Sequence, residues 1–274
     1  MAATGVVDIH RAERAARLLR RVGHWGALLT LAVLAASMLM RLTTAIDAEG
    51  AARSGLPEAI EAAARLGHRL AAMGVSVLAL LAAMIAFTTR PAPPGRLVAV
   101  ALVLALTVFL AVLGRYTPGY RAAIVTVGNV VGGIGLACAF WWLRERSSGI
   151  VPIARSREAA LAWLAFAALV AQSGLGAATS ALAMHGQRTL DPLHLAMGIA
   201  FAAFAALAAW PHRRRPGSAR LALAVVLLVA FQFALGLFLA SAVLGRPWPL
   251  AWTHAMGACA LAIALTALAA RSRG

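Results

Sequence analysis

Apolar residues fill eight long runs of this sequence, and charged residues, glycines and prolines separate the runs. The runs span roughly residues 24–43, 66–87, 97–114, 122–143, 159–180, 192–210, 220–243 and 250–270. A helix needs about 20 apolar residues to cross a bilayer, and each run comes close to that length. Because a bilayer core offers no water to backbone amides, such segments must bond their own backbone as helices. The pattern therefore predicts eight transmembrane helices.

Arginines between the runs predict the orientation of these helices. The side that holds both termini would carry 17 arginines, and the opposite side would carry 8. Cytoplasmic loops are enriched in basic residues, so we expect both termini in the cytoplasm and the chain in the cell inner (plasma) membrane. Residues 1–22 are then a basic cytoplasmic tail that precedes an uncleaved first span.

Composition agrees with a membrane protein. Of the 274 residues, 62% are hydrophobic and 12% are charged, whereas soluble domains carry about a quarter charged residues. The net charge of +16 comes from 25 arginines and no lysine. In a soluble chain this excess would suggest nucleic acid, but here the arginines flank apolar runs, so we expect membrane lipid and no nucleic acid. Cys138 and Cys259 lie inside apolar runs, as packing residues do.

Four polar positions recur at almost constant spacing. His68 and His194 are 126 residues apart, and Asn129 and His254 are 125 apart, with gaps of 61 and 60 within the two halves. This repetition predicts two tandem four-helix bundles, residues 23–146 and 147–274, related by pseudo-two-fold symmetry about an axis along the membrane normal. The expected fold class is thus an all-α integral membrane protein.

All four polar positions fall in the first third of an expected span, at one depth towards the outer face. Ionisable residues inside a span are rare and are functional candidates. Two neutral imidazoles from facing helices, such as those of His194 and His254, can ligate both faces of a haem iron. Zinc would require three or four ligands, and no carboxylate or thiol is near. The alternative is that each histidine only bonds a neighbouring carbonyl group.

Glycines and arginines near these positions admit two interpretations. Gly198, Gly257 and the pair Gly132 and Gly133 follow the polar positions by three or four residues and would let a flat macrocycle approach, or would serve helix packing. Arginines near the outer boundary would pair with haem propionates or extend to lipid phosphate. These arginines are Arg41, Arg69, Arg115 and Arg121. We expect the remaining histidines to be solvated or interfacial, namely His10, His24, His185 and His212.

Several segments in order resemble the haem A synthase family over essentially the whole chain after residue 23. The first span ends in MRLTTA, the second begins with His68-Arg69, and the sixth contains His194. The seventh contains FQFALG (residues 231–236), and the eighth has the pattern His-x-x-Gly-Ala from His254. The resemblance implies an oxidoreductase that converts a methyl group of haem O into the formyl group of haem A for cytochrome oxidase biogenesis.

The resemblance also assigns roles to residues. It implies a haem b between His194 and His254 in the second half, and a substrate haem, haem O or a related haem, in the first half. The substrate haem would lie between His68 and position 129, beside Arg69. The expected catalytic residues are His68 and Glu61. The expected partners are the haem substrate, haem O synthase or cytochrome oxidase subunits.

Three departures from the family pattern affect the first half. Position 129 is Asn instead of His, and Arg65 stands where the family has Glu, with Glu61 one turn earlier. The cysteine pair that some members carry is missing from residues 46–58. Two hypotheses therefore remain: a haem A synthase-like enzyme, and a non-catalytic bis-histidine haem b protein for electron transfer, haem sensing or oxidase assembly. A repeat-built transporter is less favoured, because we see no pair of broken helices at corresponding positions.

Overall fold

The structure is a computed structural model that describes residues 2–46, 52–54, 57–89, 93–116, 122–148, 156–183, 186–215, 217–241 and 247–272. In these ranges the chain is helical apart from short connections and one small hairpin. The helices are α1 (Ala2–Leu42), α2 (Glu58–Thr88), α3 (Pro94–Arg115), α4 (Ala123–Arg146), α5 (Arg157–Ala183), α6 (Asp191–Ala209), α7 (Ala219–Ser241) and α8 (Trp248–Arg271).

Eight helices in the described ranges are long and apolar enough to cross a membrane, which confirms the helices expected from the apolar runs. The chain is therefore a multi-pass membrane protein. A 3-10 helix, η1 (Trp210–Arg214), extends α6. Strands β1 (Thr44–Ile46) and β2 (Ala52–Ser54) pair antiparallel between α1 and α2, with Thr44 opposite Ser54.

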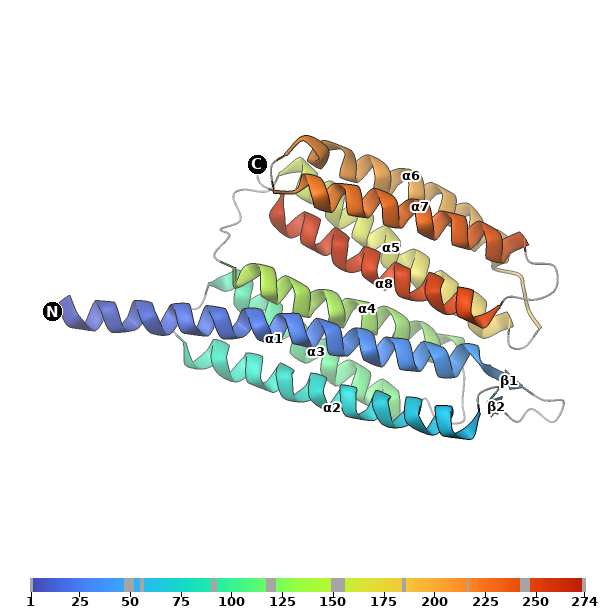
Figure 1. Ribbon diagram of the computed structural model, residues 1–274, viewed down its shortest axis with the longest axis horizontal. Coiled ribbons are helices and arrows are strands. Elements are labelled where there is room, and N and C mark those ends of the chain that lie inside the picture. Colours follow the sequence, from blue (N-terminus) through green and yellow to red (C-terminus); the bar gives the residue numbers. More distant parts are fainter. Residues whose placement is uncertain are drawn as a thin grey trace.

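Helix α1 is longer than the first apolar run, because it includes residues 2–22. Ala15, Leu19 and Val22 are buried, and they follow one another at helical spacing on a single face. The expected basic tail is thus continuous with the first span, and its end projects from the bundle (Figure 1).

The helices form two groups that lie side by side (Figure 1). In the first group, α1 and α3 each contact α2 and α4; in the second, α5 and α7 each contact α6 and α8. Helices α2 and α4 therefore occupy opposite corners of the first group, as α6 and α8 do in the second. Contacts of α4 with α5 and α8, and of α1 with α8, join the groups.

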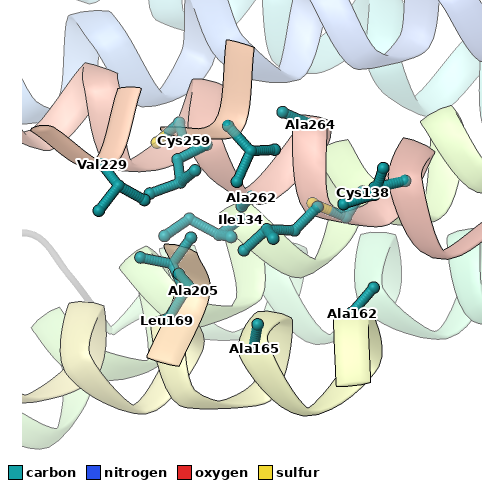
Figure 2. Packing of buried hydrophobic residues seen from close by; sticks show 14 of the residues in the cluster. Ile134, Cys138, Ala162, Ala165, Leu169, Ala205, Val229, Cys259, Ala262 and Ala264 are labelled. Carbon is teal, nitrogen blue, oxygen red and sulfur yellow. The ribbon is translucent and has the colours of Figure 1, made fainter. Parts of the chain in front are cut away.

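Small side chains fill the interior of the second group and its junction with α4. Ala162, Ala165, Ala205 and Ala262 pack with Ile134 and Leu169 in one buried cluster (Figure 2). Both cysteines, Cys138 and Cys259, are free thiols buried in this cluster, as expected for packing residues. Membrane helices associate through close packing because lipid is as apolar as the side chains, so small residues let the backbones approach.

The backbones of α1 and α4 approach each other closely at Gly23. A Cβ at Gly23 would lie 2.6 Å from the carbonyl oxygen of Phe140 and 2.8 Å from the amide nitrogen of Arg144 on α4. Gly132 and Gly133 also lie at helix contacts, against Phe109 and Leu34 respectively. These two glycines therefore serve helix packing, which is the second of the two interpretations.

Candidate functional site

A cavity of about 680 Å³ lies within the second group of helices and against α1 and α4. Small-molecule sites typically have volumes of ~300–1,000 Å³ and a mostly apolar lining with a few polar groups. The apolar lining includes Val130, Ile134, Phe201 and Leu261. The polar lining includes His194, His254, Gln172, Gln232 and Ser173.

One end of the cavity is lined by charged residues. Arg41 at the end of α1, Arg188 before α6, and Asp191 at the start of α6 line it, together with Trp248 at the start of α8. All four lie at the end of the bundle where the odd-numbered helices finish and the even-numbered helices begin. The cavity therefore combines an apolar interior with an end where two guanidinium groups outnumber the one carboxylate of Asp191, an arrangement that suits an apolar ligand with carboxylate groups.

His194 is held by the side chain of Gln172 on the neighbouring helix α5. The amide nitrogen of Gln172 lies 2.8 Å from the backbone carbonyl oxygen of His194 and 3.0 Å from its ring nitrogen Nδ1. The carbonyl oxygen can only accept, so the amide nitrogen is the correct group at this position. The Nδ1 of His194 therefore accepts a hydrogen bond, and the proton of a neutral ring is on Nε2.

His254 lines the same cavity from α8 but has a different environment. Its Nδ1 is buried and has no hydrogen-bond partner among the described residues. The amide nitrogen of Gln232 on α7 also has no hydrogen-bond partner among the described residues, and water cannot easily supply one because only 8% of this residue is exposed. Leaving such a group unsatisfied costs ~1–3 kcal/mol. Two unsatisfied polar groups beside one cavity indicate that a ligand belongs there.

The two histidines occupy equivalent places in two helical hairpins. Gln172 precedes His194 by 22 residues, and Gln232 precedes His254 by 22. A glycine, Gly176 or Gly236, follows each glutamine by four residues. A Cβ at Gly176 would lie 2.8 Å from Cε1 of His194, and a Cβ at Gly236 would lie 3.3 Å from Cε1 of His254. Each imidazole ring thus packs against a glycine on the preceding helix.

Gly198 and Gly257 do not have the role of admitting a macrocycle. A Cβ at Gly198 would lie 3.1 Å from the amide nitrogen of Gln172, and a Cβ at Gly257 would overlap the amide of Gln232. The space beside these glycines is therefore taken by glutamine side chains. Sequence reasoning missed Gln172 and Gly176, although the repeated Gln-x-x-Leu-Gly pattern of α5 and α7 was visible.

The polar positions of the first group are arranged differently. The Nδ1 of His68 lies 3.2 Å from the carbonyl oxygen of Val33 on α1. Asn129 is partly buried on α4, at the corner opposite α2. Neither residue lines the cavity described above. The structure thus brings His194 and His254 to one cavity and gives no such relation for His68 and Asn129.

The other expected site residues of α2 are close to solvent or lipid. Arg65 donates from Nε to Oε1 of Glu61 at 2.8 Å, one turn away on the same helix. Seven residues separate Glu61 from His68, which corresponds to about 10 Å along the helix axis. Arg69 is exposed, as is Arg115 at the end of α3, while Arg121 lies outside the described residues.

The remaining histidines show one error in the sequence-based interpretation. His212 was expected to be solvated or interfacial, but it is completely buried in η1, where Oγ of Ser272 lies 3.4 Å from its Nε2. The short helix η1 places the His212 side chain against Ser272, at the end of α8. His10 is exposed, and His24 packs beside Trp25 and Trp141. His185 lies outside the described residues. Among the described residues, no group of three or more His, Cys, Asp or Glu side chains is placed to hold a metal ion.

The chain was compared with known protein families and with curated proteins, and neither comparison found a match. The function must therefore be inferred from the cavity and its residues.

Proposed function

We propose that this chain is a haem-binding integral membrane protein that holds a haem b between His194 and His254. The observation that carries the proposal is that these two histidines, from opposite corners of one helix group, line a single cavity. Facing imidazoles on helices of a bundle are a common way to ligate both faces of a haem iron. The unsatisfied amide of Gln232 and ring nitrogen of His254 support the presence of a ligand.

The other residues of the cavity also fit a haem. Its interior is mostly apolar, which suits a porphyrin face, and its volume is within the range of ligand sites. Arg41 and Arg188 at one end suit the two propionate groups, because guanidinium groups bind carboxylates through paired hydrogen bonds. His194 fits with one condition, since its Nε2 ligates only after the proton has moved to Nδ1.

A haem with two histidine ligands would supply one-electron transfer at this site. His194 and His254 would ligate the iron, and the alanine-rich packing around Ile134 and Leu169 would exclude water. The arginine-lined end of the cavity would hold the propionates. Axial ligands and burial set the reduction potential of a haem. This non-catalytic bis-histidine haem b function, in electron transfer, haem sensing or oxidase assembly, is the one that the cavity supports best.

The architecture and orientation are part of the proposal. We propose that residues 23–146 and 147–274 are tandem four-helix bundles related by pseudo-two-fold symmetry, supported by the spacings of 126 and 125 residues. The excess of arginines on the side of both termini supports a cytoplasmic location for them. The arginine-lined end of the cavity then faces the outer side of the plasma membrane.

A second candidate is a haem A synthase-type oxidoreductase with a substrate haem in the first bundle. One observation favours it, the contact of His68 Nδ1 with the carbonyl oxygen of Val33. The carbonyl can only accept, so Nδ1 carries a proton and the neutral ring has its lone pair on Nε2, as metal-ligating histidines are usually arranged. Haem O synthase and cytochrome oxidase subunits would be the partners of such an enzyme.

The haem b proposal is tested on purified full-length chain in detergent or nanodiscs. Wild-type protein is expected to contain haem b with a low-spin spectrum, and His194→Ala or His254→Ala is expected to abolish it. His10→Ala, at an exposed position, is the matched control and should leave the spectrum intact. Wild-type protein without haem after haem supplementation, or an unchanged spectrum in both cavity variants, would contradict the proposal.

The enzymatic candidate needs a separate experiment. The chain is produced together with a source of haem O, and the extracted haems are separated by chromatography. Conversion of haem O to haem A that depends on His68 would support the enzyme. Recovery of haem B and unconverted haem O alone would leave the electron-transfer proposal in place and exclude the synthase.

A further inference from the structure

The amide group of Gln172 is in contact with two different acceptors of one residue. Its nitrogen Nε2 lies 2.8 Å from the carbonyl oxygen of His194 and 3.0 Å from the ring nitrogen Nδ1. The two N–H groups of a primary amide can serve both acceptors at once. Gly198, whose Cβ would lie 3.1 Å from the same nitrogen, provides the room for this amide on α6.

The amide orientation determines the tautomer of His194. With the nitrogen facing the ring, Nδ1 must be unprotonated, and Nε2 carries the proton. A neutral imidazole in this form is a hydrogen-bond donor at Nε2 and cannot ligate a metal there. If the amide turns, its oxygen faces Nδ1 and accepts a proton from it, which leaves a lone pair on Nε2.

The structure supplies a reason for such a turn. The Oε1 of Gln172 is buried and has no hydrogen-bond partner in the described part of the chain. A buried acceptor without a donor is unfavourable, and the Nδ1–H group of the other tautomer would satisfy it. The turn replaces two hydrogen bonds that the amide donates, to the His194 carbonyl oxygen and to Nδ1, with one that it accepts from Nδ1–H. It also brings Oε1 close to that carbonyl oxygen, so the new bond from Nε2 to an iron would have to offset these losses.

We infer that Gln172 is a positioning residue that selects the tautomer of His194, and so determines whether this side of the cavity donates a hydrogen bond or ligates an iron. The inference has two parts. The effect on iron ligation rests on the proposed haem site. The selection of the tautomer, by which the amide keeps the proton on Nε2 when no ligand is bound, concerns the chain alone.

The two sides of the cavity differ in this respect. Gln232 has the same spacing to His254, but its amide nitrogen and the Nδ1 of His254 each have no partner among the described residues. His254 is therefore not committed to one tautomer by a side chain. Of the two histidines, His194 is therefore the one whose tautomer a side-chain amide fixes.

The tautomer is read directly by nitrogen NMR of the haem-free full chain in nanodiscs, with ¹⁵N-labelled histidine and a spectrum of His194→Ala to assign the signals. We expect the Nε2–H form in the wild type. Gln172→Glu, whose carboxylate accepts but does not donate, is expected to give the Nδ1–H form, and Gln172→Leu a mixture. Gln187→Leu, at an exposed position before α6, is the matched control.

Two results would overturn the inference. One is an Nδ1–H form in the wild type, and the other is an unchanged tautomer in Gln172→Glu. If Gln172→Leu does not fold, the tautomer of His194 in the near-isosteric Gln172→Glu still tests the inference. Because these spectra are recorded without haem, they are interpretable whether or not the proposed haem site is correct.

Haem titration then tests the effect of Gln172 on iron ligation. Gln172→Glu is expected to bind haem about fivefold more tightly, because no hydrogen bond must be broken first, and its haem is expected to have a lower reduction potential, since a stronger acceptor makes the ligand more basic. Equal affinity and potential in both proteins would overturn the coupling to ligation. No haem in either protein, with the expected tautomers, would instead refute the proposed function and leave the tautomer selection standing.

Discussion

The ring nitrogen Nδ1 of His68 lies 3.2 Å from the backbone carbonyl oxygen of Val33 on the neighbouring helix. The carbonyl accepts, so the imidazole donates from Nδ1 and its neutral form has a lone pair on Nε2. His194 has the opposite arrangement, because its Nδ1 accepts from the amide of Gln172. The neutral ring of His68 thus has a lone pair on Nε2, whereas that of His194 would have one there only after a change of tautomer.

This difference leads to a prediction about the number of haems. With haem O and haem B both supplied, the synthase candidate predicts that wild-type protein binds two haems and that His68→Ala loses one without affecting the spectrum of the other, whereas the haem b proposal alone predicts one haem. The haem-to-protein ratio and extracted haem types measure this. A ratio unchanged by His68→Ala would show that the first bundle holds no haem through this residue.

The glycine that packs against the ring of His194 gives a second prediction. In Gly176→Ala the new Cβ would lie 2.8 Å from Cε1 of the imidazole, so the ring must move. Overpacking typically costs ~1–3 kcal/mol, which corresponds to roughly 5–150-fold weaker haem binding. Gly236→Ala is expected to have a smaller effect, because its Cβ would lie 3.3 Å from the ring of His254.

Haem titration of the purified variants measures both effects. Gly114→Ala is the matched control, since nothing lies within 4 Å of a Cβ at that position. Equal haem affinity in Gly176→Ala and Gly114→Ala would mean that the position of the His194 ring does not matter for binding.

The sequence was sufficient for the eight helices because each apolar run is long and bounded by polar residues. It also predicted that His194 and His254 lie at the same depth in the membrane, because both fall near the start of spans that begin on the same side. The helical state of residues 2–22 was not evident from the sequence, because this arginine-rich segment has no apolar run and its buried face, with Ala15 and Leu19, is narrow. A narrow face becomes recognisable only when a partner helix, here α2, is known to cover it.

The parts of the site that were missed depend on side-chain contacts between helices. Gly198 and Gly257 were assigned to a ligand because they follow histidines, but glutamine amides from the preceding helices take their space. Helix periodicity relates residues within one helix and contains no information about the rotation of its neighbour. The recurrence of Gln172 and Gln232 at 22 residues before a histidine was the available signal for these contacts.

The close approach of α1 and α4 at Gly23 predicts a strong effect of a small substitution. A methyl group there would lie 2.6 Å from a carbonyl oxygen of α4, and a backbone cannot move aside as a flexible side chain can. Gly23→Ala is therefore expected to lower the free energy of unfolding by about 1–3 kcal/mol. Gly114→Ala should instead be neutral or stabilising by ~0.5–1 kcal/mol, because alanine favours a helix over glycine. Thermal unfolding in one detergent compares the two, and equal melting temperatures would contradict the predicted contact.

A buried carboxylate joins the two helix groups at the end opposite the arginine-lined mouth of the cavity. Glu145 on α4 is 4% exposed, and its oxygens accept from Nε and Nη2 of Arg271 on α8 at 3.0 and 2.7 Å. Arg144 donates to the same carboxylate at 2.7 Å. This two-pronged contact fixes the end of α8 against α4, and so supports the helix that carries His254.

Removal of this carboxylate should destabilise the contact between the groups. In Glu145→Gln the two guanidinium groups lose their charged acceptor, and since both arginine side chains remain about a third exposed, water offsets part of the loss. We expect a destabilisation of about 1–3 kcal/mol, the usual cost of losing hydrogen bonds to a charged group. Glu13→Gln, which breaks an exposed pair with Arg17 at 3.6 Å, is the control and should change stability by less than ~0.5 kcal/mol. Thermal unfolding at low and high salt separates the two, because the exposed pair is screened and the buried one is not. If Glu145→Gln unfolds at the wild-type temperature, the carboxylate does not hold α8 to α4. The position of α8 beside the cavity must then be fixed by the apolar packing around Cys259 and Leu265.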